Sequence, residues 1–462
     1  MNTLKPQFVP PLDENFMPAC LFNRYYRSKV KQAQAAGKEV CRFAIAVEAA
    51  PRSIGRYDVD ILTAAEDQEE TWRFLERHLK FVLWLQGGYR VVVHGPQVFC
   101  RRFQQIYSPN GERAFDSGIM HKVYGRSLEI VIANREQEVP ASQTNKQEIG
   151  GHLEGCRIGF DLGASDYKLA AVKDGKPVFS EEIPWNPAVQ SDPSYHYQKI
   201  MEGLELAASK LPRVDAIGGS AAGIYINNQV KVASLFRAVP DDRFEAEVKD
   251  MFNRIAERWD VPLTVVNDGD VTALAGAMSL KTSNLLGIAM GSSEAVGYID
   301  DEQRITGSLH ELAFAPVDFY PDAPLDEWSG DRGGGALYFS QQAVNRLLPR
   351  AGIDLPDDVP VPEKLKEVQS LAEADDSRAR SIFETIGVYL GYSLVHYHDY
   401  YKYDNVLLLG RVSSGAGGKV IVSKAREILE YAFPDLVGTI DLKVPDEKSR
   451  RVGQAVAAAS LP

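Results

Sequence analysis

The first third of the chain combines short apolar runs with one long amphipathic stretch. Residues 42–47 and 89–93 are mostly apolar runs of strand length, and 127–133 forms a third. Residues 68–85 repeat apolar side chains at the three-to-four spacing of a helix, and 99–107 does so over a shorter span. Strands that alternate with helices in this way predict a mixed α/β unit.

Two polar segments flank this pattern. Residues 23–38 carry Arg24, Arg27 and Lys29 on a predicted helix, which is typical of a solvated helix face and, less often, of a surface for an anionic partner. Residues 134–153 lack any sustained period and contain Pro140. We therefore interpret 134–153 as a linker, with a new domain starting near Cys156.

Composition agrees with a folded, multi-domain protein. The chain has 462 residues, of which 45% are hydrophobic and 25% charged, as in globular proteins. Its 51 Lys and Arg against 63 Asp and Glu give a net charge of −12, which disfavours nucleic acid as a partner. We find no apolar segment long enough to enter a membrane and no signal peptide. The four scattered cysteines favour a reducing, cytoplasmic compartment.

The second part of the chain begins with a predicted β-hairpin. Strands at 157–161 and 167–172 flank the segment Asp161-Leu162-Gly163-Ala164-Ser165. Gly163 lets backbone N–H groups approach a phosphate, Ser165 can donate to it, and Asp161 can hold Mg²⁺ through water. An ordinary hairpin turn with a capping Asp is the alternative. No dinucleotide-binding or Walker motif opens a helix here, so those folds are disfavoured.

A second hairpin of the same design follows later. The apolar strand 285–290 runs into Gly291-Ser292-Ser293, and the strand 294–299 leaves it. Two phosphate loops on separate lobes could hold one nucleotide from both sides and exclude water from phosphoryl transfer. A plain β-meander without a ligand remains the alternative.

Between the two hairpins lies the strongest candidate for a general base. The strand 261–266 is followed by Asn267-Asp268-Gly269-Asp270 and a helix of small residues. A carboxylate at the carboxyl end of a strand can accept the proton of an attacking hydroxyl, and we assign this role to Asp268. Asp270 is the competitor, and either Asp could instead cap the helix. Asn267 could orient a substrate through its amide or be a turn residue.

At this point residues 156–462 resemble the ROK family of sugar kinases and sugar-responsive repressors, within the actin-like, hexokinase-like ATPases. Six segments occur in the family's order. They are Asp161 to Ser165 (family D-x-G-G-T), Gly218 to Gly223 (G-I-x-x-P-G), Asn267-Asp268 (N-D-A-N), Gly291 to Gly297 (G-T-G-I-G-G-G), Glu311 to Phe314 (G-E-I-G-H) and Leu408 to Val412 (G-G-G-V).

The resemblance implies an α/β fold, a two-lobed actin-like ATPase (ribonuclease H-like) preceded by an additional α/β domain. The implied domains are 1–150, of unknown role; 156–275, to which a C-terminal helix at 447–462 returns; and 280–446. It also implies an ATP-dependent kinase for a sugar hydroxyl, with Mg²⁺. Sugar and nucleotide are the expected partners, and a homodimer is left open.

The resemblance assigns individual residues. Asp268 is the implied catalytic base, and the implied sugar ligands are Asn267, Glu311 and Gly223. The implied nucleotide and phosphate ligands are Asp161, Gly163, Ser165, Gly291, Ser292, Gly410 and Arg411, with Asp161 also positioning Mg²⁺. The competing hypothesis is a sugar sensor or scaffold without turnover and without the helix-turn-helix of the family's repressors, because the N-terminal unit reads as α/β.

Several positions depart from the family pattern. The family's structural zinc site takes a His and three Cys, whereas this chain has Phe314 and the thiol-free segment 327–334. We expect no zinc and a loop held by packing instead. Leu235 stands near the position of a sugar-binding Asn. In the segments that would bind the nucleotide, Glu294 adds a negative charge to the second loop and Arg411 stands where the family has a Gly. These two departures keep the non-catalytic hypothesis open.

Overall fold

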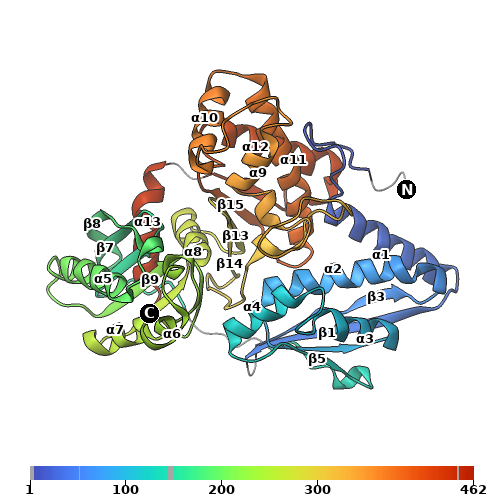
Figure 1. Cartoon of the computed structure of the whole chain (residues 1–462), viewed down its shortest axis with the longest axis horizontal. Helices are drawn as coiled ribbons and strands as arrows, with labels where there is room; N and C mark the ends of the chain where they lie inside the picture. The colour runs from blue at the N-terminus through green and yellow to red at the C-terminus, as the bar shows by residue number, and fades with distance from the viewer. Residues whose placement is uncertain (1–4, 51–52, 144–148, 445–446) are drawn as a thin grey trace.

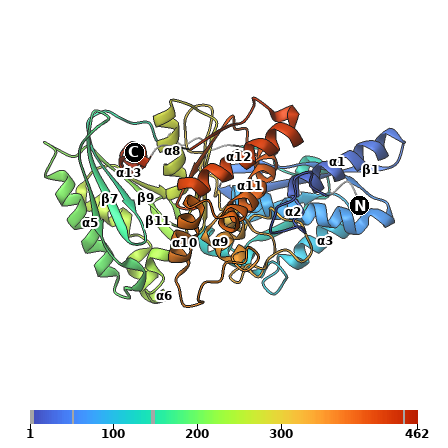
Figure 2. The same cartoon turned by 90° about the horizontal axis from the view of Figure 1, so that it is seen from above.

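The computed structural model describes residues 5–50, 53–143, 149–444 and 447–462. Figure 1 shows three regions: an N-terminal unit (5–143), a first lobe (149–280 together with the C-terminal helix) and a second lobe (285–444). The second lobe lies between the other two, and the view from above in Figure 2 shows the same order. The mixed α/β class predicted from the sequence is confirmed for this architecture.

The N-terminal unit is built on a mixed sheet in the order β2-β1-β4-β5, with β3 also paired to β1. Strands β4 and β5 are parallel and the β1 pairs are antiparallel. Its helices and strands are α1 (Ala19–Ala35), β1 (Val40–Ala50), β2 (Ser53–Arg56), β3 (Val59–Leu62), α2 (Gln68–Gln86), β4 (Arg90–His94), α3 (Gln97–Ile106), α4 (Ala114–Tyr124) and β5 (Glu129–Ile132). The elements predicted here from periodicity are therefore present.

The N-terminal unit shares one hydrophobic core with the second lobe. Phe16 packs against Tyr389, with ring centroids 4.7 Å apart, and a single cluster of buried side chains continues from one region into the other. Basic residues of α1 join the same junction: Arg27 pairs with Asp399 at 2.5 Å and Arg24 with Asp435 at 3.4 Å. Both arginine side chains are 37% exposed, so this face of α1 is at the surface, as expected, and it also makes ion pairs with the second lobe.

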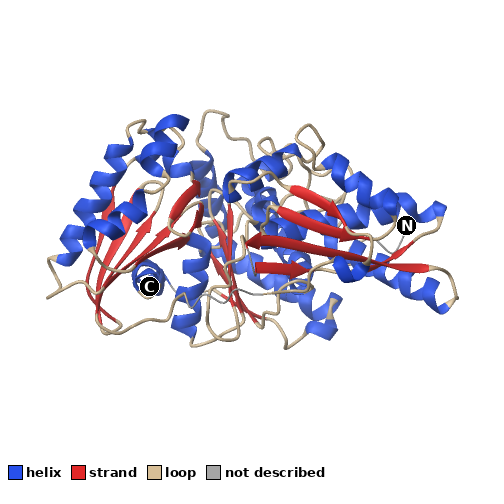
Figure 3. Ribbon diagram, turned by 90° about the horizontal axis from the view of Figure 1, so that it is seen from below, coloured by secondary structure: helices blue, strands red, loops and turns tan. Residues whose placement is uncertain are grey.

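The first lobe holds a five-stranded sheet in the order β12-β9-β6-β7-β8 (Figure 3). Strands β12, β9 and β6 are parallel, while β6, β7 and β8 form an antiparallel meander. The elements are β6 (Cys156–Leu162), β7 (Asp166–Lys173), β8 (Lys176–Pro184), α5 (Pro193–Ala208), β9 (Ala216–Ala221), β10 (Ile224–Ile226), β11 (Gln229–Val232), α6 (Asp241–Arg243), α7 (Met251–Trp259), β12 (Leu263–Asn267) and α8 (Asp268–Leu280). The predicted first hairpin is β6 and β7.

The second lobe holds a four-stranded sheet in the order β14-β13-β15-β16. Alternate residues of β13 face opposite sides: Leu286 joins the core shared with the N-terminal unit, and Leu285 packs with α8. The elements are β13 (Leu285–Met290), β14 (Glu294–Ile299), α9 (Gln341–Leu347), α10 (Val361–Glu373), α11 (Ser377–His398), β15 (Asn405–Leu409), α12 (Gly415–Ala432) and β16 (Asp441–Lys443). The second predicted hairpin is β13 and β14.

Two close backbone approaches set how α8 and the last helix, α13 (Glu447–Ala459), pack. A Cβ on Gly297 of β14 would overlap the carbonyl of Gly269 in the first turn of α8. On the other side, Cβ atoms on Gly159 and Gly218 would overlap carbonyls of α13. Glycine is therefore required at these crossings. As a result, α8 lies against the second lobe while α13 covers the first-lobe sheet (Figure 1).

All four cysteines carry free thiols, in agreement with the scattered pattern of the sequence. In the part of the chain that is described, no helix has the length and apolar character needed to cross a membrane.

Candidate active site

The parallel strands of the first lobe bring the predicted acidic residues to one edge of the sheet. In the register of the sheet, Asp161 of β6 pairs with Ser220 of β9, and Ser220 in turn pairs with Val266 of β12. Asp268 follows two residues after Val266, at the start of α8. Asp161 therefore lies near the end of β6 and Asp268 directly after β12, with β9 between the two strands, at the edge where open α/β sheets present ligand groups.

Asp161 is held in a defined orientation. Its Oδ1 accepts a hydrogen bond from the Ser220 hydroxyl at 2.6 Å, and its Oδ2 pairs with the Lys168 ammonium at 3.2 Å. Only 6% of the residue is exposed. A carboxylate with this restricted access suits outer-sphere binding of Mg²⁺, which keeps most of its waters. Sequence reasoning missed both Ser220 and Lys168.

The first loop forms the tight turn expected of a hairpin. The Gly163 N–H donates to the Asp166 carbonyl at 3.0 Å, and the Gly163 carbonyl accepts from the Trp185 indole at 2.8 Å. The Ser165 hydroxyl donates to the Asp166 carboxylate at 3.0 Å and is exposed. The backbone of Gly163 is thus engaged within the turn, and Ser165 lies at its surface.

Asn267 is the N-cap of α8. Its side-chain oxygen accepts from the Gly269 N–H at 2.7 Å, and its amide donates to the Gly223 carbonyl at 2.8 Å. The alternative that Asp268 or Asp270 caps the helix is wrong, because both residues lie within the first turn. The amide of Asn267 is largely used by the protein, which ties α8 to the loop of Gly223.

One cavity of about 310 Å³ joins the predicted motifs of both lobes. Its volume is at the lower end of the range for small-molecule sites. The predicted residues that line it are Gly223, Asn267, Asp268, Gly291, Ser292, Glu294, Glu311 and Phe314. Asp161, Gly163 and Ser165 are not among its lining residues. The cavity therefore has a carboxylate from the first lobe facing the phosphate-loop candidate of the second.

The carboxyl groups around this cavity are poorly solvated. Burial, together with the neighbouring Asp161, raises the pKa of Asp268 to about 6. Burial and Asp268 raise the pKa of Glu311 to about 7, and burial raises the pKa of Glu294 to about 8. Burial and Glu311 likewise hold the pKa of Asp270 well above its usual range. Perturbed carboxyls gathered in one cleft are typical of a functional site.

The second loop is braced from the second lobe. The Gly291 N–H donates to the Ser293 carbonyl at 3.0 Å, and the Gly291 carbonyl accepts from the Gln341 N–H at 2.9 Å. Directly after the loop, Glu294 is buried, and its Oε1 accepts from the Tyr397 hydroxyl at 3.2 Å. The loop therefore has a fixed shape, with an acidic group at its end.

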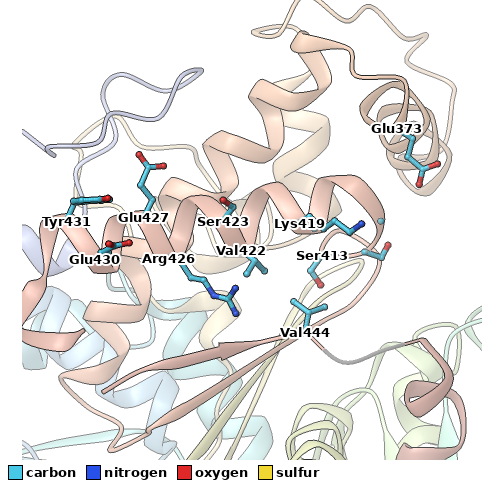
Figure 4. A pocket seen from close by; sticks show the side chains of 13 residues that line it. Glu373, Ser413, Lys419, Val422, Ser423, Arg426, Glu427, Glu430, Tyr431 and Val444 are labelled. Carbon is cyan, nitrogen blue, oxygen red and sulfur yellow. The ribbon is translucent and has the colours of Figure 1, made fainter. Parts of the chain in front are cut away.

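A larger open cavity of about 1140 Å³ lies in the second lobe, along α12 (Figure 4). It is lined by Ser413 and Ser414 before the helix, by Lys419 and Arg426 on it, and by Glu373 of α10. Gly410 precedes it with φ +93°, and a side chain there would overlap the Met290 carbonyl.

The Arg411 side chain is exposed, and the Arg411 carbonyl accepts from Gln369 at 2.5 Å. Arg411 is absent from the lining residues of this cavity.

The N-terminal unit contributes to the 310 Å³ cavity, which the sequence did not predict. Trp84 of α2 lines it and packs against Phe314, with ring centroids 4.5 Å apart. Phe314 also packs against Trp328 at 5.2 Å. Ser234 lines the cavity, whereas its neighbour Leu235 is buried in the first-lobe core. The long apolar face of α2 signals a core helix, and no local pattern shows that its end reaches another domain.

The thiol-free loop of the second lobe is held by buried charges from the N-terminal unit. Asp331 pairs with Arg113 at 2.7 Å, Lys80 at 3.0 Å and Arg77 at 3.2 Å. Glu76 and Asp116 complete the set by pairing with the same cations. The expectation that packing alone holds this loop is therefore wrong. We call these six residues the junction cluster: Glu76, Arg77, Lys80, Arg113, Asp116 and Asp331.

Comparison with known proteins places the fold. No protein-family model and no curated protein sequence matches this chain. Among solved structures, a ROK family transcriptional regulator, described as a homologue of the E. coli MLC protein, is similar with a TM-score of 0.52 and 17% identity. The match covers 70% of this chain and 82% of that one. The ROK hexokinase from Thermus thermophilus is similar with a TM-score of 0.51 and 16% identity, over 66% of this chain and 97% of that one.

The chain therefore has the fold of ROK proteins, a class that includes both sugar kinases and a transcriptional regulator. The resemblance stated from six short motifs is confirmed at the level of the fold. At these identities the similarity concerns architecture, and the chemistry has to be argued from the site.

Proposed function

We propose that this protein is a ROK-type kinase that transfers the γ-phosphoryl group of ATP to a sugar hydroxyl. One observation carries the proposal: Asp268, Glu311 and the Gly291-Ser292 loop line a single cavity between the lobes. A base, a polar sugar ligand and a phosphate loop are the groups that such a transfer requires. The hexokinase neighbour supports the same assignment at the level of fold.

In this proposal Asp268 accepts the hydroxyl proton as the alcohol attacks phosphorus. A pKa of about 6 leaves the carboxylate ionised at neutral pH and still basic enough to take a proton. Asp270 is the weaker candidate, because it lines a different cavity from the one that contains the Gly291 loop. Glu311 would accept hydrogen bonds from sugar hydroxyls, and Asn267 would hold Gly223 and α8 in place for the same substrate.

On the nucleotide side, the Gly291-Ser292 loop and the Gly163-Ser165 turn would contact phosphates from the two lobes. Gly410 would allow close approach of the adenosine, with the exposed Arg411 at the rim. Asp161 would hold Mg²⁺ through water, and the ion would supply charge neutralisation of the phosphates when bound.

We further propose the domain limits 1–150, 156–275 with the terminal helix, and 280–446. Residues 1–150 would then complete the sugar side of the site, because Trp84 lines the cavity.

The test is an ADP-release assay over a panel of sugars, run with the wild type, Asp268→Asn and Asp270→Asn, together with calorimetric sugar binding for each. We expect sugar-dependent ADP release that Asp268→Asn reduces by about 10²- to 10⁴-fold while sugar binding persists. The matched Asp270→Asn variant should keep most of the activity. Equal loss in both variants, or no loss in Asp268→Asn, contradicts the assignment of the base.

A second function, a sugar sensor without turnover, is favoured by one observation. Glu294 places a buried carboxyl directly after the phosphate-loop candidate, where it would repel a triphosphate when ionised. The regulator among the structural neighbours has the same fold. Sugar binding without ADP release for any sugar in the panel would support this function over the kinase.

A further inference from the structure

Few side chains of the 310 Å³ cavity are free to bind the hydroxyl groups of a ligand. Both ends of the Asn267 side-chain amide already form hydrogen bonds within the protein, so Asn267 contributes little. Outside the loop of residues 291–293, the lining residues that carry a hydroxyl, amide or carboxyl group are Ser234, Asn267, Asp268, Glu294 and Glu311.

Glu294 lines the cavity without directing its carboxyl group into it. Its Oε1 accepts from the Tyr397 hydroxyl at 3.2 Å, and its Oε2 lies against Gly335, where an added Cβ would overlap it. Neither Tyr397 nor Gly335 is among the lining residues. Apart from the Trp328 indole, the side-chain groups left for a ligand are the Ser234 hydroxyl and the carboxyls of Asp268 and Glu311.

The backbone of the cavity wall is also partly occupied. The Gly223 carbonyl accepts from the Asn267 amide at 2.8 Å, and the Glu311 carbonyl accepts from the Phe314 N–H at 3.2 Å. The Ala233 carbonyl accepts a backbone N–H at 3.1 Å. A buried hydroxyl that loses its hydrogen bonds to water without replacing them is costly. The wall therefore disfavours a fully hydroxylated hexose.

The rest of the wall is apolar and includes an accessible aromatic surface. Phe314 is half-buried and packs against Trp328 with ring centroids 5.2 Å apart, and 63% of Trp328 is exposed. Trp84 supports Phe314 from behind, because it is fully buried and its indole N–H donates to Asp116 at 2.9 Å. Such rings offer a large apolar contact area to a ligand. The larger apolar side chains of the lining are Trp84, Ile119, Ile224, Val232, Phe314 and Trp328.

The cavity also suits a neutral ligand. Its lining residues, all within the described part of the chain, include no Lys, Arg or His that would bind an anion. Burial and the neighbouring Asp268 raise the pKa of Glu311 to about 7. At neutral pH this carboxyl is therefore partly protonated, and a protonated carboxyl both donates and accepts hydrogen bonds. These are the bonds that a neutral hydroxyl group forms.

We propose that the substrate of this site is a neutral deoxy sugar. Its remaining hydroxyl groups face Asp268 and Glu311, and its deoxygenated side packs against Phe314 and Trp328, which set the specificity. The inference rests on the proposed function, because it takes the cavity beside Asp268 as the sugar site, and it names the substrate class that the cavity selects. The apolar wall favours the deoxy sugar because no hydroxyl has to give up its water there.

The test compares glucose, mannose and galactose, each with its 2-deoxy and 6-deoxy derivatives. Binding to the full chain is measured by calorimetry without nucleotide, and ADP release is measured separately. We expect at least one deoxy sugar to bind about tenfold more tightly than its parent. Parents that bind as tightly as their deoxy derivatives, or an absence of binding by every deoxy sugar, overturn the inference.

The two proposals fail in different ways. Preferential binding of a deoxy sugar without ADP release supports the deoxy-sugar inference and contradicts the kinase. ADP release with a preference for a fully hydroxylated parent supports the kinase and contradicts the inference.

Variants of the aromatic surface test the residues. Phe314→His adds a hydrogen-bond donor and an acceptor to the apolar wall and should reduce the preference for the deoxy sugar by about tenfold. Trp328→Ala should weaken binding of the deoxy sugar more than binding of its parent. Tyr431→Ala is the matched control for Trp328, because Tyr431 is 59% exposed and does not line the cavity, and it should leave the preference unchanged.

Thermal unfolding verifies that each variant is folded. Because Trp328 is largely exposed, Trp328→Ala keeps the inference testable even where Phe314→His does not fold. An unchanged preference in the folded cavity variants overturns the inference.

Discussion

The Arg113 guanidinium lies 2.7 Å from the Asp331 carboxylate, and this ion pair joins the N-terminal unit to the second lobe. Both side chains are largely buried, and the pair belongs to the junction cluster of three basic and three acidic residues. The loop of Asp331 also carries Trp328, which lines the candidate sugar cavity. The junction therefore connects the N-terminal unit mechanically to the site.

Removing Asp331 should destabilise the protein strongly. Asp331→Ala leaves Arg77, Lys80 and Arg113 with two acidic partners, and an uncompensated buried charge costs about 3–5 kcal/mol. The free energy of unfolding from urea titration measures the effect. The control is Glu69→Ala, which breaks the exposed pair with Arg102 and should leave the unfolding midpoint almost unchanged. Equal midpoints for the two variants would show that the junction cluster contributes no net stability.

Acid should open the same junction. The cations beside Asp331 and Glu76 hold the pKa values of both carboxyls below their usual range. A carboxyl with a lowered folded pKa contributes stability that is present above its unfolded pKa of about 4 and is lost as the pH falls further. We expect the melting temperature to fall steeply below pH 4 in the wild type and much less in Asp331→Asn, measured by circular dichroism from pH 7 to pH 3.

The carboxyls of the cavity should have the opposite effect on stability. The pKa of Glu294 is raised to about 8, so the folded protein favours its protonated form, and this contribution disappears as the pH rises through 8. Glu294→Gln should therefore raise the melting temperature at pH 9 and change it little at pH 4. The gain at pH 9 is at most about 5 kcal/mol. A variant that is less stable than the wild type at pH 9 would mean that the ionised carboxylate is well solvated.

Activity should depend on the ionisation of Asp268. If it acts as the base, kcat/KM for the sugar falls below a pH of about 6, because the protonated carboxyl cannot accept the hydroxyl proton. Steady-state rates from pH 5 to pH 8 measure this limb. The residual activity of Asp268→Asn should not fall in this way below pH 6. If both proteins lose activity over the same pH range, the titrating group is not Asp268.

The backbone conformation at position 410 requires a glycine, whether or not a ligand approaches it. A side chain there would meet positive φ and also overlap the Met290 carbonyl, so Gly410→Ala should cost about 1–3 kcal/mol. Gly438→Ala is the matched control, because Gly438 has φ +80° with open space around it. Chemical denaturation should show the larger loss for Gly410→Ala, and the reverse order would contradict the steric argument.

Much of the local structure could be predicted because its causes are local. The hairpin of β6 and β7, the hairpin of β13 and β14, and helix α2 follow from apolar periodicity and from Gly-containing turns. The meeting of Asp161 with the start of α8 also follows, since parallel strands share one edge. Which residue caps α8 could not be predicted from the sequence. Asn267, Asp268 and Asp270 all have side chains suited to an N-cap, and only the backbone conformation decides among them.

By itself, the sequence determined the order of the elements, the two loops and the candidate base, since side-chain period and turn chemistry act over a few residues. Three features were decided by the tertiary structure alone. Trp84 reaches the cavity, and buried ion pairs of Asp331 hold the loop that has no cysteines. One carboxylate oxygen of Glu294 lacks a hydrogen-bond partner. These contacts join residues far apart in the chain, and long-range packing and burial leave no local pattern from which they could be read.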